Sequence, residues 1–171
     1  ELLDREKVET CARQGFQPVV HDVSGVEAVV ATAEVGAIVV WLKVDTGMHR
    51  LGVSPEDCEH LYGQLRTCAH VDDVRLMTHF SSSEEEETST TEQQIERFES
   101  ATANLPGITR CLANSAAILS HDRSHAEWAR PGLPLYGADP LARANDLSSQ
   151  LRPAMQLQSQ VIAVREIAAG E

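Results

Sequence analysis

The residues best suited to chemistry in this chain are charged or polar side chains placed where apolar, strand-like segments end. They come one after another along the sequence: Lys43 with Asp45, Arg50, His79, Asn114 with Ser115, and Arg130 with Tyr136. In α/β barrels and open parallel sheets, active sites gather at the carboxyl ends of the strands. The repeated placement therefore predicts that these side chains meet at one site.

The first of these segments carries a lysine that needs an explanation. Lys43 lies inside an apolar strand-like run, two residues before Asp45 and on the same face. A lysine in a covered strand is costly unless it is paired or neutralised, so an ion pair with a nearby carboxylate is the structural alternative to a functional role. Beyond Asp45, turns at Gly47 and Gly52 would swing Arg50 back over the strand ends, because glycine tolerates positive φ. There Arg50 would clamp an anion or a phenolate; bracing the loop is the alternative.

The later segments predict a phosphate site. His79 is a lone histidine at a strand end, and most such histidines are hydrogen-bonded core residues. Asn114 and Ser115 end a strand and open a helix, where unpaired backbone N–H groups bind anions. Gly132 would let the backbone approach a ligand closely. A phosphate held by the loops after the last strands is a recurrent feature of (β/α)8 barrels.

The elements that must position these residues alternate between helix and strand. Helical apolar faces are predicted for Leu2–Ala12, for a segment with Val26, Val29, Val30 and Ala33 that Ser24 would cap, for a segment that starts at Ser54-Pro55-Glu56-Asp57, and for one capped by Thr90 or Thr91. Strands are predicted at Gln17–His21, Ala37–Asp45, Val74–Phe80, Thr109–Ala113 and Leu133–Tyr136. Five such alternations predict a parallel α/β architecture.

The pattern changes after Pro140. Residues 142–150 are predicted to be a polar connection, and Met155–Val164 alternates between apolar and polar side chains, as in an antiparallel strand with one wet face. One strand cannot form an independent domain, so the C-terminus is interpreted as artificial or truncated.

Charge and cysteine spacing exclude several classes of protein. The formal net charge is −12, with acidic residues scattered along the chain, which argues against a nucleic-acid partner. The run Glu84–Glu87 is expected to be a solvated loop, and no apolar run is long enough for a membrane span. The four cysteines form no CxxC pair, so we expect reduced thiols and no metal site.

Four stretches, taken together, resemble the bacterial alanine racemases in order and spacing, and the likeness covers essentially the whole chain. They are Leu42–Val53, Met77–Phe80, Ala113–Ala117 and Arg130–Gly137. The resemblance implies a partial (β/α)8 TIM-type barrel with about five of its eight strands at residues 1–141, the connection at 142–150, and the first strand of a C-terminal all-β domain at 151–171.

The same resemblance implies a pyridoxal 5'-phosphate cofactor and a role for each matching residue. Asn114 and Ser115, with the backbone of Gly132 and Leu133, would hold the phosphate. Arg130 would donate to the pyridine nitrogen, and because arginine stays protonated it would limit the ring as an electron sink. His79 would lie against the ring and position Arg130. Arg50 would reach the phenolic oxygen and the substrate carboxylate, and Lys43 matches a lysine that can be carbamylated, which would turn a buried cation into an anion that orients Arg50.

The implied activity is interconversion of L- and D-alanine, supplying D-alanine for peptidoglycan or L-alanine for catabolism, in a cytoplasmic homodimer. The family's Schiff-base lysine and catalytic tyrosine have no match here, so the isolated chain is expected to be inactive. Ser81-Ser82-Ser83-Glu84 departs from the family's usual small-acidic stretch, and a loop there is expected to tolerate this. Two alternatives stay open: a non-catalytic barrel protein that binds the cofactor, and a relative of the metal-assisted D-hydroxy-amino-acid aldolases or dehydratases.

Overall fold

The computed structural model describes residues 3–32, 36–105 and 107–170, whose strands form one four-stranded parallel sheet in the order β1-β2-β3-β4. The strands are β1 (Val19–Val20), β2 (Ile38–Lys43), β3 (Val71–Met77) and β4 (Arg110–Cys111). Each strand pairs in parallel with the next, which requires a crossover connection every time. The predicted parallel α/β architecture is confirmed.

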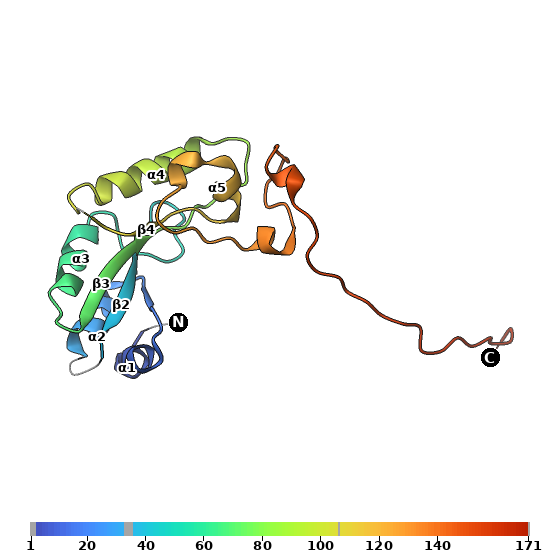
Figure 1. Cartoon of the computed structure of the whole chain (residues 1–171), viewed down its shortest axis with the longest axis horizontal. Coiled ribbons are helices and arrows are strands. Elements are labelled where there is room, and N and C mark those ends of the chain that lie inside the picture. The colour runs from blue at the N-terminus through green and yellow to red at the C-terminus, as the bar shows by residue number, and fades with distance from the viewer. Residues whose placement is uncertain (1–2, 33–35, 106, 171) are drawn as a thin grey trace.

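Helices cover one side of the sheet (Figure 1). These are α1 (Arg5–Gln14), α2 (Val23–Ala31), α3 (Cys58–Arg66), α4 (Ser89–Ala101) and α5 (Ser115–Ser120). Helix α1 packs on α2, α2 on α3, and α3 on β3. Of the helices that the structure describes, none has the length and apolar character needed to cross a membrane.

Alternation along the strands separates a packed face from a polar one. Val20, Leu42 and Leu76 stand in register, are almost fully buried and belong to the hydrophobic core with the helices. Residues one position away point to the opposite face. There the guanidinium of Arg75 packs against the rings of Trp41 and Trp128, with its Cζ 5.5 Å and 5.3 Å from the ring centroids. Lys43, two residues after Trp41 in β2, shares this second face.

Helix starts correct two predictions from the sequence. The cap of α2 is Asp22, whose Oδ1 accepts from the backbone N–H of Gly25 at 2.7 Å, and not Ser24, whose hydroxyl donates to the same oxygen. Thr90 and Thr91 lie inside α4, which begins at Ser89. In α2 a carboxylate takes the capping position, and α4 starts earlier than expected. Helix ends are the positions that sequence patterns define least well.

The start of α3 follows its prediction more closely. The hydroxyl of Ser54 accepts from the backbone N–H of Asp57 at 3.1 Å and donates to the carboxylate of Asp57 at 2.8 Å, one turn before Cys58. Leu2 and Ala33, which the sequence placed on helical apolar faces, lie outside the described residues.

The predicted fifth strand at Leu133–Tyr136 is wrong: these residues form a 3₁₀ helix. The chain runs beside β4 earlier, where Trp128 bridges Cys111 in parallel and the backbone N–H of Arg130 donates to the carbonyl of Ala113 at 3.0 Å. Pro131 and Pro134 explain the difference, because proline lacks the N–H that a strand needs and favours the first turn of a helix.

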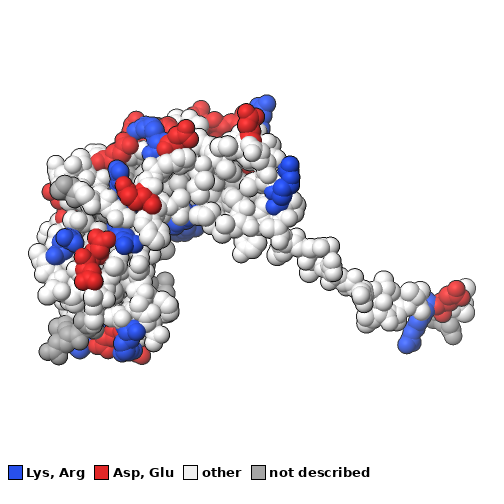
Figure 2. All heavy atoms as spheres, viewed as in Figure 1, with Lys and Arg blue, Asp and Glu red and all other residues white. Residues whose placement is uncertain are grey.

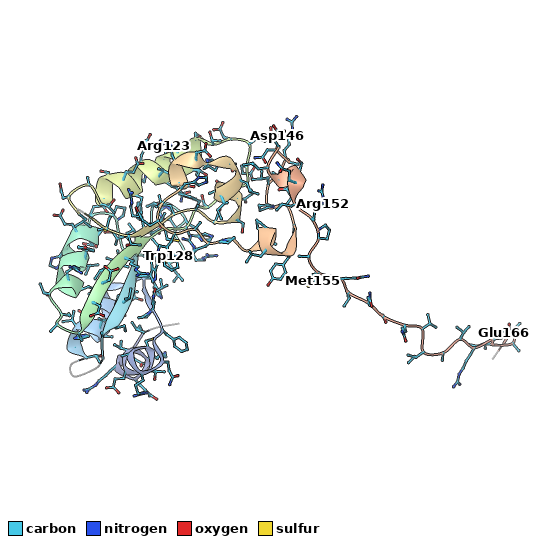
Figure 3. The ribbon with its side chains drawn as sticks, in the orientation of Figure 1. Arg123, Trp128, Asp146, Arg152, Met155 and Glu166 are labelled. Atoms are coloured by element: carbon cyan, nitrogen blue, oxygen red, sulfur yellow. The ribbon has the colours of Figure 1, made fainter. Side chains whose placement is uncertain are left out.

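The C-terminal segment does not confirm the predicted strand. Met155–Val164 has no strand assignment, and Leu157 and Ile162 are 97% and 98% exposed. In Figures 1 and 3 this segment runs away from the body, from Met155 to Glu166. An isolated strand lacks a partner for its backbone groups, so no ladder forms.

The connection at residues 142–150 is partly folded rather than plain linker. It contains a 3₁₀ turn at Ser148–Gln150, and Asn145 Nδ2 donates to the carbonyl of Leu119 at 2.7 Å. Glu84–Glu87 is exposed as predicted, and the pair of Glu86 with Arg143 ties that loop to the connection. Figure 2 shows further acidic side chains beside basic ones along the upper edge, where Arg123 pairs with Glu92 and Glu99 of α4.

Candidate active site

The site begins at the end of β2 with a buried amine. Lys43 is 8% exposed and stands in register with Met77 of β3, which in turn is in register with Cys111 of β4. Within the described ranges, no carboxylate lies within ion-pair distance of its Nζ. Burial lowers the pKa of Lys43, and the nearby positive charges of Arg50 and Arg130 lower it further. Both effects destabilise the charged form of this amine relative to a lysine side chain in water.

The nearby carboxylate is engaged elsewhere, so the ion-pair alternative for Lys43 does not hold. Asp45 Oδ1 accepts from the backbone N–H groups of Gly47 and His49, both at 3.0 Å, and its other oxygen faces the His49 ring at 3.3 Å. These hydrogen bonds lower the pKa of Asp45 against the opposing effect of burial. Asp45 thus shapes the turn and contributes only a weaker attraction to Lys43.

The turn after Asp45 needs its two glycines, as predicted. Gly47 and Gly52 have φ of 137° and 142°. A Cβ on Gly52 would lie 2.5 Å from the backbone nitrogen of Asp45, which no side chain can accept. The turn carries Arg50 to an exposed position that still depresses the pKa values of Lys43 and His79 electrostatically. The structure therefore brings Arg50, Lys43 and His79 to one edge of the sheet.

Arg130 is held by the ends of two strands. Its Nη1 donates to the carbonyl of Cys111 at 2.8 Å and to the sulfur of the same residue at 3.0 Å. Its Nη2 donates to the carbonyls of Thr78 at 2.8 Å and Leu112 at 3.3 Å, and lies 3.4 Å from His79 Nδ1. A guanidinium has five N–H donors, and all five of these contacts are made by the four N–H groups on the terminal nitrogens.

The remaining donor of Arg130 is its Nε–H. In the described part of the chain it has no hydrogen-bond partner, and it is not one of the polar atoms that are buried without one. A donor that is reachable and fixed in direction by the other four is suited to a single acceptor on a ligand.

His79 lies beside this guanidinium and is half-buried. Burial lowers its pKa, and the positive charges of Arg130, Lys43 and Arg50 lower it further. The ring is therefore neutral at pH 7, so that Nδ1 can accept from Arg130. This contact matches the pairing of His79 with Arg130 that the resemblance implied.

The residues predicted to bind a phosphate also lie close together. Asn114 caps α5 by accepting from the backbone N–H of Ala117 at 3.0 Å. The hydroxyl of Ser115 accepts from the backbone N–H of Gly132 at 2.8 Å, and a Cβ on Gly132 would lie 3.3 Å from that hydroxyl. Leu133 follows at the start of the 3₁₀ helix and is 52% exposed. A hydroxyl and a backbone N–H from separate loops thus lie in direct contact.

Sequence reasoning missed two residues that touch this site. Cys111 was grouped with the other reduced thiols, but its sulfur accepts from Arg130. Ser83 was placed in a tolerant loop, but it is fully buried and its hydroxyl donates to Asn114 Oδ1 at 2.8 Å. The signal for Cys111 was its position three residues before Asn114, at the end of an expected strand; Ser83 carried no comparable signal.

Comparison with known proteins identifies what the chain is similar to. Residues 1–140 match the family "Alanine racemase, N-terminal domain". The chain is 44% identical over 165 residues to the alanine racemase of Shewanella loihica, covering 96% of this chain and 46% of that protein. The chain therefore spans about half the length of the curated relatives it matches.

Solved structures agree. The biosynthetic alanine racemase from Pseudomonas aeruginosa superposes with a TM-score of 0.86 at 36% identity, over 99% of this chain and 47% of that one. The Bartonella henselae alanine racemase with covalently bound pyridoxal phosphate gives a TM-score of 0.68 at 25% identity, over 79% of this chain and 40% of that one.

Proposed function

Because this chain belongs to the alanine racemase family, we propose that it supplies the cofactor- and substrate-binding edge of an enzyme that interconverts L- and D-alanine with pyridoxal 5'-phosphate. The observation that carries the proposal is Arg130, whose terminal N–H groups are bound by strand ends so that Nε–H is left for a ligand. Arg130 would donate this hydrogen to the pyridine nitrogen without being able to surrender it.

The residues present fit the cofactor at its other end as well. Ser115 and the backbone of Gly132 and Leu133, arranged by Asn114, would bind the phosphate, since hydroxyl and backbone N–H groups are its usual ligands. Pyridoxal phosphate, when bound, makes the hydrogen on the substrate Cα acidic by withdrawing electrons from the amino nitrogen. His79 would lie against the ring and keep Arg130 oriented.

Arg50 and Lys43 would act where the substrate binds. Arg50 is exposed and would bind the alanine carboxylate and the phenolic oxygen of the cofactor. The neutral amine of Lys43 would attack carbon dioxide and release one proton, which gives a carbamate anion in place of a buried cation. Such an anion would balance Arg50. Carbon-13-labelled bicarbonate should give a carbamate signal in NMR spectra that is absent from Lys43→Met.

The rest of the proposal concerns the whole protein. Residues 1–141 belong to the barrel, 142–150 to the connection and 151–171 to the opening of a β-domain; the family match, which stops at residue 140, supports the first boundary. The exposed apolar side chains of 155–167 are consistent with a segment that pairs within a further domain. A homodimer in the cytoplasm completes the proposal, as in the resemblance.

Racemisation is the test. In a full-length enzyme carrying this chain, L-alanine should lose its circular dichroism signal over time. Arg130→Leu should slow this by about 100-fold or more, as removal of a positioned donor does in other active sites. Arg143→Leu is the matched control, because Arg143 is an exposed arginine that pairs with Glu86 outside the site.

Other outcomes would contradict the proposal. Cleavage of a D-3-hydroxy amino acid, with no racemisation of alanine, would favour the aldolase relatives. Stoichiometric cofactor binding without either reaction would favour a non-catalytic barrel protein.

A further inference from the structure

The loop that follows His79 contains a serine that is buried, although the polar sequence around it predicts exposure. Ser83 is 0% exposed, whereas the four glutamates after it are exposed. Its hydroxyl donates to Asn114 Oδ1 at 2.8 Å, across 31 positions of sequence. A buried hydroxyl with a specific long-range partner is an unusual occupant of a tolerant surface loop.

Asn114 receives two hydrogen bonds on the same oxygen. One comes from Ser83 and the other from the backbone N–H of Ala117 at 3.0 Å. A side-chain amide held by one hydrogen bond can still rotate about its last torsion, but two donors from different directions fix the oxygen. Ser115 is the next residue, and its hydroxyl lies 2.8 Å from the backbone nitrogen of Gly132.

The backbone of Ser83 is also held by hydrogen bonds. Its carbonyl accepts from His121 Nε2 at 3.3 Å and from the hydroxyl of Ser120 at 3.4 Å. His121 is 4% exposed, and its other ring nitrogen lies 3.8 Å from a carboxylate oxygen of Glu92 in α4. The serine is therefore a fixed point between the end of α5 and its beginning.

We propose that Ser83 is a positioning residue for the phosphate-binding pair made by Ser115 and the backbone N–H of Gly132. It acts through Asn114 and touches no ligand itself. This inference rests on the proposed function, because it assumes that the Ser115–Gly132 pair binds the cofactor phosphate. It predicts that the hydroxyl of Ser83 contributes to recognition of the phosphate and not of the pyridine ring.

The test compares two ligands that differ only in the phosphate. Pyridoxal phosphate and pyridoxal are titrated into a full-length enzyme carrying this chain, and binding is followed by the absorbance of the ligand. Ser83→Ala should weaken pyridoxal phosphate by about 3- to 10-fold, the usual worth of one hydrogen bond, and should leave pyridoxal unchanged. The inhibition constant of inorganic phosphate should be higher in the variant than in the parent.

Ser120→Ala is the matched control. It removes a hydroxyl that contacts the same residue, through the carbonyl of Ser83, but does not touch Asn114. Both affinities should stay at the parent values. Ser83→Cys keeps most of the side-chain volume and replaces a strong donor by a weak one, so it should show the same selective loss if Ser83→Ala does not fold.

Two results would overturn the inference. An unchanged preference for pyridoxal phosphate in both Ser83 variants would remove the hydroxyl from phosphate binding, and equal losses for both ligands would make its role a general structural one. The proposed function fails separately: in that case the parent protein itself would show no preference for the phosphorylated ligand.

Discussion

The two arginines of the site are held in opposite ways. Arg130 donates from both terminal nitrogens to strand-end carbonyls and to the sulfur of Cys111. Arg50 stands exposed on a turn, and within the described residues its side chain makes no hydrogen bond or ion pair. One guanidinium is fixed by the protein before any ligand arrives, and the other is left to respond to one.

The same difference extends to the neighbours of each arginine. Beside Arg130, His79 is kept neutral and within reach of Nη2. Beside Arg50, Lys43 is buried, and no carboxylate of the described residues lies within ion-pair distance of it. Under the proposed function, the fixed side would present one donor to the ring nitrogen of the cofactor in a constant geometry. The unbalanced side suits an anion, which would remove the repulsion among the cations.

The largest effect should come from removing the fixed guanidinium. Arg130→Leu leaves the carbonyls of Thr78, Cys111 and Leu112 without this donor, and we expect a loss of about 3 kcal/mol in the free energy of unfolding. Arg50→Leu should change it by less than about 0.5 kcal/mol, as surface substitutions do. Urea unfolding of the two variants measures both. Equal losses of stability in the two variants would contradict the difference between the two arginines.

The next effect concerns the turn that carries Arg50, which depends on its glycines as well as on the hydrogen bonds of Asp45. Gly52→Ala forces a Cβ to within 2.5 Å of a backbone nitrogen at a φ of 142° and should cost about 2 kcal/mol. Gly63 lies inside α3, where an added methyl group would meet no atom within 4 Å, so Gly63→Ala should stabilise by about 0.5 to 1 kcal/mol. In thermal unfolding, the melting temperature should fall for Gly52→Ala and rise for Gly63→Ala. A harmless Gly52→Ala would mean that the turn can relax.

The smallest effect is a pH dependence of the free energy of unfolding that is caused by Lys43. The pKa of Lys43 is lower in the folded protein than its ordinary 10.5. The unfolded chain therefore binds more protons between these two values, and the free energy of unfolding should rise with pH across that window because of Lys43. Below the window Lys43 is charged in both states and the cost of burying it is fully present.

Lys43→Met should remove this rise, as measured by urea unfolding at a series of alkaline pH values. Lys7→Met is the control, because Lys7 lies at the surface on α1, where its Nζ pairs with Asp4 at 3.3 Å. An unchanged pH dependence in Lys43→Met would show that the buried amine is not the source.

Much of the fold could be predicted from the sequence because the central strand β2 is buried along nearly its whole length. The run around Leu42 consists of continuous apolar residues, which is typical of a strand inside a parallel sheet. The prediction at Leu133–Tyr136 was wrong because its apolar residues are shared by strands and short helices, and the two prolines decide between them. The predicted strand at Met155–Val164 has the correct alternation, but pairing depends on a neighbour and not on the pattern.

The composition of the site could also be predicted, but its contacts could not. Lys43, His79 and Arg130 stand out because charged or polar residues at the ends of apolar strands are rare without a reason. Nothing in the spacing indicated that Asp45 serves its own turn and leaves Lys43 without a carboxylate, or that a thiol would accept from Arg130. Those contacts depend on register between strands, which fixes the residues that face each other.

By itself, the sequence determined which residues end the strands, where the glycine turn falls and which family the motifs resemble, since these depend on local pattern along the chain. Tertiary structure alone decided that, among the described residues, Nε–H is the donor Arg130 has left, that no carboxylate there pairs with Lys43, and that Ser83 reaches Asn114. The physical reason is that each of these facts is a competition among partners distant in sequence, and only three-dimensional packing sets their distances.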